Sequence, residues 1–76
     1  MTIEMAIRKR IFDLLEEKKL NISDLCSRIN VSPSTLYDLE KNRTKVLKVS
    51  TVKQLCFGFG ITMAEFFSPD YFNDEE

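Results

Sequence analysis

Two short helical segments with a three-residue connection constrain the fold more than any other feature of this chain. Asn21 and Ser32 are suitable N-cap residues, and Pro33 suits the first position of a helix, so a helix is predicted to begin at each point. Two helices joined so closely must cross steeply, which leaves little room between them. Seven positions within residues 22–41 meet this requirement with apolar, small or turn-forming residues: Leu25, Cys26, Ile29, Asn30, Val31, Leu36 and Leu39.

Helical spacing also covers the segments on either side. Apolar residues recur every three or four positions from Ile3 onward, which predicts a first helix that Thr2 caps and that runs to about Lys19. A fourth helix is expected to begin within residues 48–51 and to end at Gly60. The first helix carries charged residues between the apolar ones, so it is expected to bury one face and to expose the other. The fourth helix is expected to bury Val52, Leu55, Cys56 and Phe59.

The remaining signals concern helix ends. Thr62 is a suitable N-cap for a short fifth helix that is expected to end near Phe67. Asn30 and Asn42 are expected to end the second and third helices, because asparagine tolerates the left-handed conformation better than most residues. The sequence therefore predicts an all-α domain of five helices, a single unit over residues 1–76.

Composition excludes several classes of function. With 76 residues, of which 43% are apolar and 30% charged, the chain suffices for one small folded domain. No stretch approaches the roughly 18 apolar residues that span a bilayer, and the first residues lack a secretory signal, so a cytoplasmic protein is expected. Cys26 and Cys56 are interpreted as packing residues in a reducing compartment. Without histidine, a phosphate-binding loop or a ligand cluster, neither an enzyme nor a metal or other cofactor is expected.

Charge is unevenly distributed along the chain. Residues 41–53 carry five bases and no acid, whereas residues 65–76 carry five acids and no base. Removing these five acids from the net charge of −1 leaves +4. Because the local potential decides where an anion binds, the basic segment is compatible with a nucleic-acid partner. The acidic tail, residues 73–76, is expected to shield that segment and to weaken nonspecific DNA binding.

The helical pair and its flanks resemble the lambda-repressor-like helix-turn-helix family, also called the XRE family. The stretches Ile7-Arg8-Lys9-Arg10-Ile11, Leu20-Asn21, Leu36-Tyr37-Asp38-Leu39-Glu40-Lys41-Asn42 and Phe59-Gly60-Ile61-Thr62 fall where that family has its landmarks. The resemblance extends over residues 3–67. It implies that the helix of about residues 33–41 is a recognition helix that enters the major groove of double-stranded DNA. It also implies a compact transcriptional regulator, which we expect to be a homodimer.

The resemblance also implies a set of DNA contacts. Carried over position by position, the candidates that face the bases are Pro33, Ser34, Tyr37 and Asp38. The candidates for phosphate contacts are Asn21, Arg43, Lys45, Lys48, Thr51 and Lys53. Serine can serve several bases and aspartate can accept from cytosine, but neither offers the two-point contact of arginine with guanine. Phosphate contacts are therefore expected to supply most of the affinity, with moderate sequence specificity.

Four aromatic rings within seven residues exceed what a short terminal segment usually buries. These rings are the candidates for a contact with a second subunit: Phe66, Phe67, Tyr71 and Phe72. With no visible sensor domain, the sequence indicates no small-molecule ligand.

Three departures from the family pattern argue against tight DNA binding. Leu15 stands where many members have an arginine that pairs with the residue at Glu40, Ile22 replaces a common glutamine, and Asp38 would repel phosphate. Ile22, Asp38 and the acidic tail favour an alternative: a protein-interaction module of the same fold, antitoxin-like or accessory, in which DNA binding is weak or lost.

Overall fold

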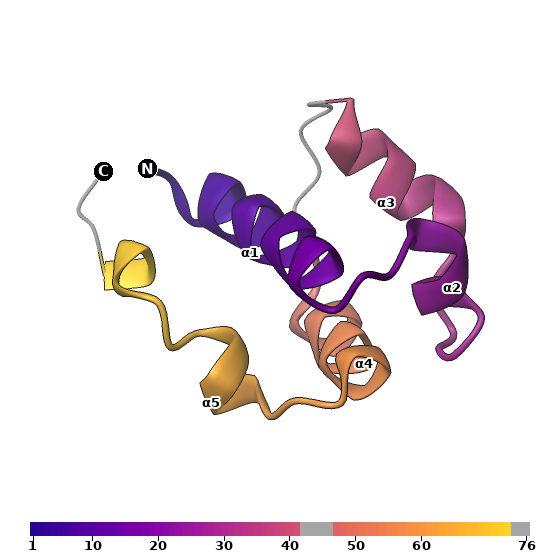
Figure 1. Ribbon diagram of the computed structural model, residues 1–76. Coiled ribbons are helices and arrows are strands. Elements are labelled where there is room, and N and C mark those ends of the chain that lie inside the picture. Colours follow the sequence, from indigo (N-terminus) through magenta and orange to yellow (C-terminus); the bar gives the residue numbers. More distant parts are fainter. Residues whose placement is uncertain (42–46, 74–76) are drawn as a thin grey trace.

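The computed structural model describes residues 1–41 and 47–73, which form five α-helices and a final 3₁₀ turn (Figure 1). In chain order the elements are α1 (Ile3–Glu17), α2 (Ile22–Cys26), α3 (Pro33–Glu40), α4 (Val49–Phe59), α5 (Met63–Phe66) and η1 (Asp70–Asn73). The described residues contain no strand, so the predicted all-α class is confirmed. Within this part of the chain, no helix is long and apolar enough to cross a membrane.

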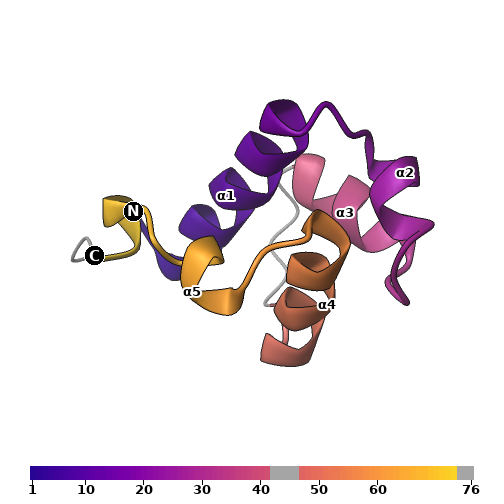
Figure 2. The same ribbon diagram turned by 60° about the horizontal axis from the view of Figure 1, so that its bottom comes forward.

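The helices surround one core to which each of them contributes. α1 runs through the middle of the molecule, with α2 and α3 toward one of its ends and α5 and η1 toward the other (Figures 1 and 2). Each α-helix contributes at least one side chain that is at most 2% exposed, among them Leu14, Leu25, Leu36, Leu55 and Phe66. Complete burial of such a side chain contributes about 1.5–3 kcal/mol, so these residues are central to stability.

Side-chain caps and left-handed residues set the helix ends. Thr2 caps α1 by accepting from the Met5 amide at 3.2 Å, and Thr62 forms a capping box with Glu65 at the start of α5. Gly60 ends α4 with φ 73°, as predicted. α1 ends two residues earlier than predicted, at Glu17, because Lys19 takes the left-handed conformation with φ 54°.

The expectation of a left-handed Asn30 is wrong. Among the described residues other than glycine, Lys19 alone has a positive φ. After α2 the chain continues in tightened turns, in which the Arg28 amide donates to the Leu25 carbonyl at 3.1 Å and the Ile29 amide to the Cys26 carbonyl at 3.4 Å. The change of direction is thus distributed over several residues, so no single one has to adopt a left-handed conformation. The corresponding expectation for Asn42 lies outside the described residues.

α2 and α4 approach each other closely at Gly58. A Cβ atom at this position would lie 2.7 Å from Leu25 Cδ1 and 2.9 Å from Ile29 Cγ2. Both distances are shorter than carbon–carbon contact allows, so the missing side chain of Gly58 permits the two helices to pack at this separation.

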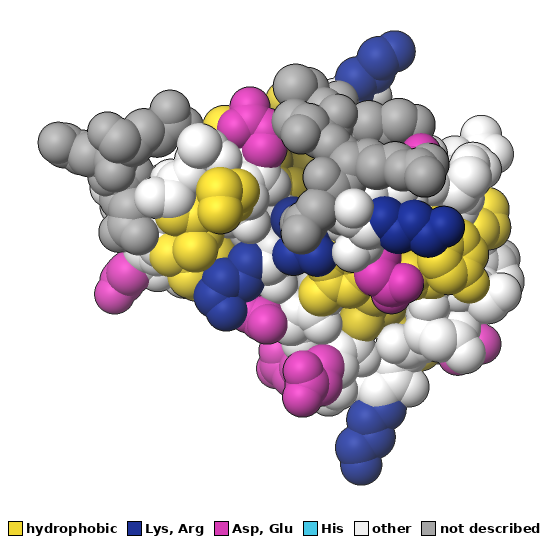
Figure 3. Space-filling view, turned by 90° about the horizontal axis from the view of Figure 1, so that it is seen from above, with side chains coloured by type: hydrophobic (Ala, Val, Ile, Leu, Met, Phe, Trp, Pro, Cys, Tyr) yellow, Lys and Arg dark blue, Asp and Glu magenta, His cyan; other side chains and the backbone are white. Residues whose placement is uncertain are grey.

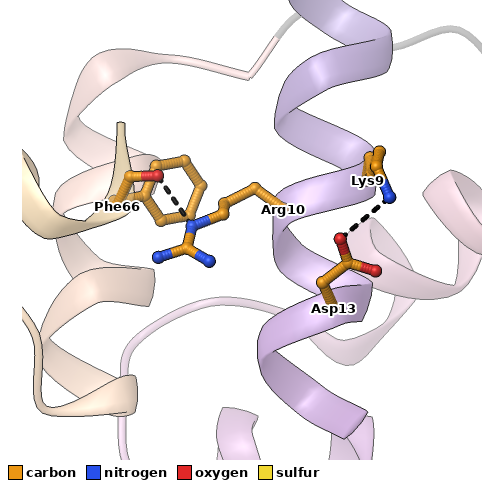
Figure 4. A network of polar contacts seen from close by, with 4 residues as sticks. All are labelled: Lys9, Arg10, Asp13 and Phe66. Carbon is orange, nitrogen blue, oxygen red and sulfur yellow. Dashed lines mark hydrogen bonds and ion pairs between the residues drawn. The ribbon is translucent and has the colours of Figure 1, made fainter. Parts of the chain in front are cut away.

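Arg10 fastens the C-terminal end of α5 to α1 (Figure 4). Its Nε donates to the Phe66 carbonyl and its Nη2 to the Glu65 carbonyl, both at 2.8 Å. A cation at this end of a helix meets unpaired carbonyls and the negative end of the helix dipole. Lys9, the residue before Arg10, forms an exposed ion pair with Asp13 at 3.0 Å, which raises the pKa of Lys9.

The C-terminal segment returns to α1, so the N-terminus and η1 lie side by side (Figures 1 and 2). Here the Tyr71 hydroxyl is buried and has no hydrogen-bond partner within the described residues. This desolvation, with a smaller effect from Asp13, raises the pKa of Tyr71 above its usual value of 10.0.

We expect Tyr71→Phe to stabilise the protein by about 1 kcal/mol, because it removes a buried hydroxyl without breaking a hydrogen bond. The raised pKa adds a pH dependence: the unfolded chain releases the Tyr71 proton first, so stability falls as the pH rises past about 10. The substitution should reduce this alkaline loss. Urea unfolding at pH 7 and above pH 10 measures both effects, and a less stable variant at pH 7 would contradict the prediction.

Candidate nucleic-acid interface

α2 and α3 cross with their apolar faces inward. Leu25 and Leu36 have no exposed surface, and Ile22 and Leu39 are each 5% exposed. The buried Ile22 explains why the chain departs from the family pattern at this position: the side chain belongs to the core. The crossing fixes the direction of α3, so the half of α3 that faces away from these residues forms a defined outer surface.

That outer surface carries three of the four side chains predicted to face bases. Pro33 and Ser34 are exposed in the first turn of α3, and Tyr37 follows one turn later with 44% of its surface exposed. Asp38 differs, because it is half-buried at the margin of this surface. The structure therefore brings Pro33, Ser34 and Tyr37 together on one side of α3 and leaves Asp38 less accessible than predicted.

The two predicted caps behave differently. Asn21 caps α2, since its Oδ1 accepts from the Asp24 amide at 2.7 Å. Ser32 occupies the N-cap position of α3, but its side chain accepts no amide. Its Oγ lies 2.8 Å from the Ser34 Oγ, and the Thr35 amide donates to the Ser32 carbonyl instead. The expectation of a side-chain cap at Ser32 is thus wrong, because the hydroxyl pairs with its neighbour.

The predicted phosphate contacts are described only in part. Lys48 is exposed at the N-cap position of α4, Thr51 is half-buried in its first turn, and Lys53 is exposed one turn further on. Arg43 and Lys45 lie outside the described residues. Asn21 is exposed at the start of α2.

The family assignment follows from this arrangement and from comparison with known proteins. A family model described as Cro/C1-type HTH DNA-binding domain matches residues 10–70, which include α2, α3 and the connection between them. The chain belongs to the Cro/C1-type family. No curated protein matches it. The resemblance seen in the sequence is confirmed, and the family is one of DNA-binding domains.

In this Cro/C1-type domain, Arg8 has a role that the sequence did not indicate. Its Nε donates to the Leu39 carbonyl at 2.7 Å and its Nη2 to the Glu40 carbonyl at 3.2 Å, which holds the C-terminal end of α3. The guanidinium also lies 5.4 Å from the centre of the Phe12 ring. Leu15, which stands where many family members have an arginine, is buried in this protein. Arg8 lies two turns before Leu15 in α1, and it holds the C-terminal end of α3 through the Leu39 and Glu40 carbonyls.

The four aromatic rings are more buried within the domain than predicted. Phe66 has no exposed surface, so it offers nothing to a second subunit, and its assignment as a dimer contact is not retained. The Phe67 and Phe72 rings pack edge-to-face with centres 5.0 Å apart, and both rings are half-buried against the core. Tyr71 is also half-buried. The most exposed large apolar side chains of the described residues are on α4: Phe57 at 76% and Val49 at 75%.

Both cysteines are packing residues, as interpreted from the sequence. Cys26 and Cys56 are buried free thiols, and burial raises the pKa of each. Such thiols remain protonated at neutral pH and are weak nucleophiles. In the described part of the chain, no group of three or more acidic, cysteine or histidine side chains could hold a metal ion.

Proposed function

We propose that this Cro/C1-type domain is a transcriptional regulator whose α3 reads the major groove of double-stranded DNA. The observation that carries the proposal is the outer face of α3, where Pro33, Ser34 and Tyr37 are exposed together while Leu36 and Leu39 hold the opposite face in the core. A helix held in this way can present its N-terminal turns to base edges.

Phosphate contacts position the reading surface. Asn21 stands at the N-terminus of α2, where helix amides and dipole favour an anion, and Lys48 and Lys53 add positive charge from α4. Arg43 and Lys45, in the basic segment between α3 and α4, are proposed to contribute in the same way. Because few side chains on α3 give two-point base contacts, specificity is moderate and the affinity depends strongly on salt.

The regulator is proposed to act as a homodimer on a pseudo-palindromic site, with recognition helices about 34 Å apart. Phe67, Tyr71 and Phe72 retain partial exposure, and Phe57 and Val49 add a larger apolar surface on α4. The protein-interaction alternative loses part of its support, because Ile22 has a packing role and Asp38 is half-buried.

Selection from random duplex DNA is expected to enrich an inverted repeat, and fluorescence anisotropy on that site then tests the surface. Ser34→Ala and Tyr37→Ala are each expected to weaken binding to the selected site by about 1–3 kcal/mol, roughly 5- to 150-fold, with little change for random DNA. Lys53→Ala is expected to weaken both and to reduce the salt slope by about 1.

Asp70→Ala is the matched control, since Asp70 is exposed in η1, far from α3 (Figure 1). It should leave the affinity for the selected site unchanged. If no sequence is enriched and no salt-sensitive binding is detected at low ionic strength, the proposal is wrong and the protein-interaction alternative replaces it.

A further inference from the structure

A hollow of about 340 Å³ lies between α1, α2 and α3, a size that suits a small organic molecule. Its floor is apolar. Leu15 and Ile22 are buried there, and Phe12 and Leu20 are half-buried against the core. The residues come from separate parts of the chain, so the hollow exists only in the folded protein. An apolar floor of this kind favours a ligand with a hydrocarbon body, which displaces water from it.

The rim of the hollow has a different character. Glu16 from α1 and Glu40 from the end of α3 line it, and both side chains are exposed. Tyr37 contributes an aromatic side chain from α3, and Asn21 contributes an amide. On the right of Figure 3, which is the side that α3 occupies in Figure 1, hydrophobic side chains are bordered by acidic and basic side chains. Arg8 lies beside the hollow, because its guanidinium donates to the Glu40 carbonyl and lies 5.4 Å from the centre of the Phe12 ring. The two carboxylates outweigh this single cation, so the rim keeps a net negative charge that attracts cations and disfavours anions.

We propose that this hollow binds a small organic cation, with an ammonium or guanidinium group on an alkyl or aryl body. The body fills the apolar floor while the cationic group remains at the rim between Glu16 and Glu40. The Tyr37 ring adds a cation–π attraction for the same group. A neutral analogue keeps only the apolar contact, and an anionic one meets two like charges.

A second hollow does not show this preference. It lies along the outer side of α1 and is lined by Met1, Met5, Arg8, Lys9, Phe12 and Asp13. Its lining combines two cations with one acid, and that acid already pairs with Lys9. The lining of the second hollow thus has a net positive charge, whereas the lining of the hollow beside α3 is net negative.

The position of the site connects it with DNA. Asn21 and Tyr37 line the hollow and also belong to the proposed DNA surface, so a bound cation neutralises carboxylates close to the expected phosphates. Cation and DNA then influence each other's affinity reciprocally. This coupling rests on the proposed function, whereas the binding of the cation does not.

The test is a titration of the protein alone, followed by ¹⁵N NMR, with three compounds of equal chain length: hexylammonium, hexanol and hexanoate. Hexylammonium is expected to shift the amides of Leu20, Asn21 and Ile22, with a Kd on the order of millimolar, as suits so small a ligand. Hexanol is expected to bind roughly fivefold more weakly, and hexanoate more weakly still.

Variants identify the groups responsible. The double variant Glu16→Gln, Glu40→Gln is expected to lower the affinity for hexylammonium about fivefold, to that of hexanol. Glu17→Gln, on the same helix but not lining the hollow, is expected to leave it unchanged. Equal binding of hexylammonium and hexanol, or shifts confined to other parts of the protein, would overturn the proposal. Because no DNA is present, that outcome would leave the proposed DNA binding untouched.

Discussion

Replacing Phe66 by alanine is expected to lower the free energy of unfolding by about 3–5 kcal/mol. The Phe66 side chain has no exposed surface, and its ring lies 4.9 Å from the Phe67 ring and 6.1 Å from the Phe72 ring, centre to centre. A chain of 76 residues has a total stability of about 4–11 kcal/mol, so the variant should be close to unfolding at room temperature. Urea unfolding followed by circular dichroism measures the loss.

Phe57→Ala is the matched control for Phe66→Ala. The same group is removed, but Phe57 is 76% exposed on α4, so the stability of the monomer, measured at a protein concentration too low for dimerisation, should change by no more than about 0.5 kcal/mol. If Phe66→Ala left the stability intact and only changed the oligomeric state, the aromatic ring would be a subunit contact after all, and its place in the core would be wrong.

Gly58→Val is expected to destabilise the protein by about 2–3 kcal/mol. The first added carbon would lie 2.7 Å from Leu25 Cδ1 and 2.9 Å from Ile29 Cγ2, so α2 and α4 would have to separate or repack. Leu25 has no exposed surface, which leaves its side chain little space to move. Gly58→Ala should show a smaller loss, about 1–2 kcal/mol, because the better helix propensity of alanine offsets part of the strain.

Thermal and urea unfolding of the two variants can be compared with Gln54→Ala, an exposed position one turn earlier in α4, which should be neutral. Since α2 belongs to the helix pair that orients α3, Gly58→Val is also expected to weaken DNA binding at temperatures where it remains folded. An increase in stability on Gly58→Ala would show that α2 and α4 are not in close contact.

The elements and the core were predictable from local signals. The spacing of apolar residues and the caps at Thr2, Asn21 and Thr62 identified the helices to within two residues, because these signals act over a single helical turn. The end of α2 is the exception: it was expected just before Asn30, but α2 ends at Cys26. Gly60 was equally clear, since a left-handed helix end favours glycine. The exposed Pro33, Ser34 and Tyr37 followed from the same periodicity, which placed Leu36 and Leu39 on the opposite face.

The failures have two causes: some depended on a neighbour distant in sequence, and others on competition between two local options. Ser32 could cap α3 or pair with Ser34, and composition does not decide between these. Asn30 could reverse the chain alone, yet the turn is distributed over several residues. The aromatic cluster was expected to divide between core and subunit contact, and nothing local shows that Phe66 is the ring with no exposed surface.

Sequence by itself thus determined the all-α class, the helix-turn-helix segment and the outer face of α3, since each follows from periodicity and capping. Tertiary structure alone decided that Arg8 holds the end of α3, that Arg10 holds the end of α5, and that Gly58 allows α2 to approach α4. It also created the hollow with its two carboxylates. These features join residues 24 (Glu16 and Glu40) to 56 (Arg10 and Phe66) positions apart, and only the packing of the helices sets such distances.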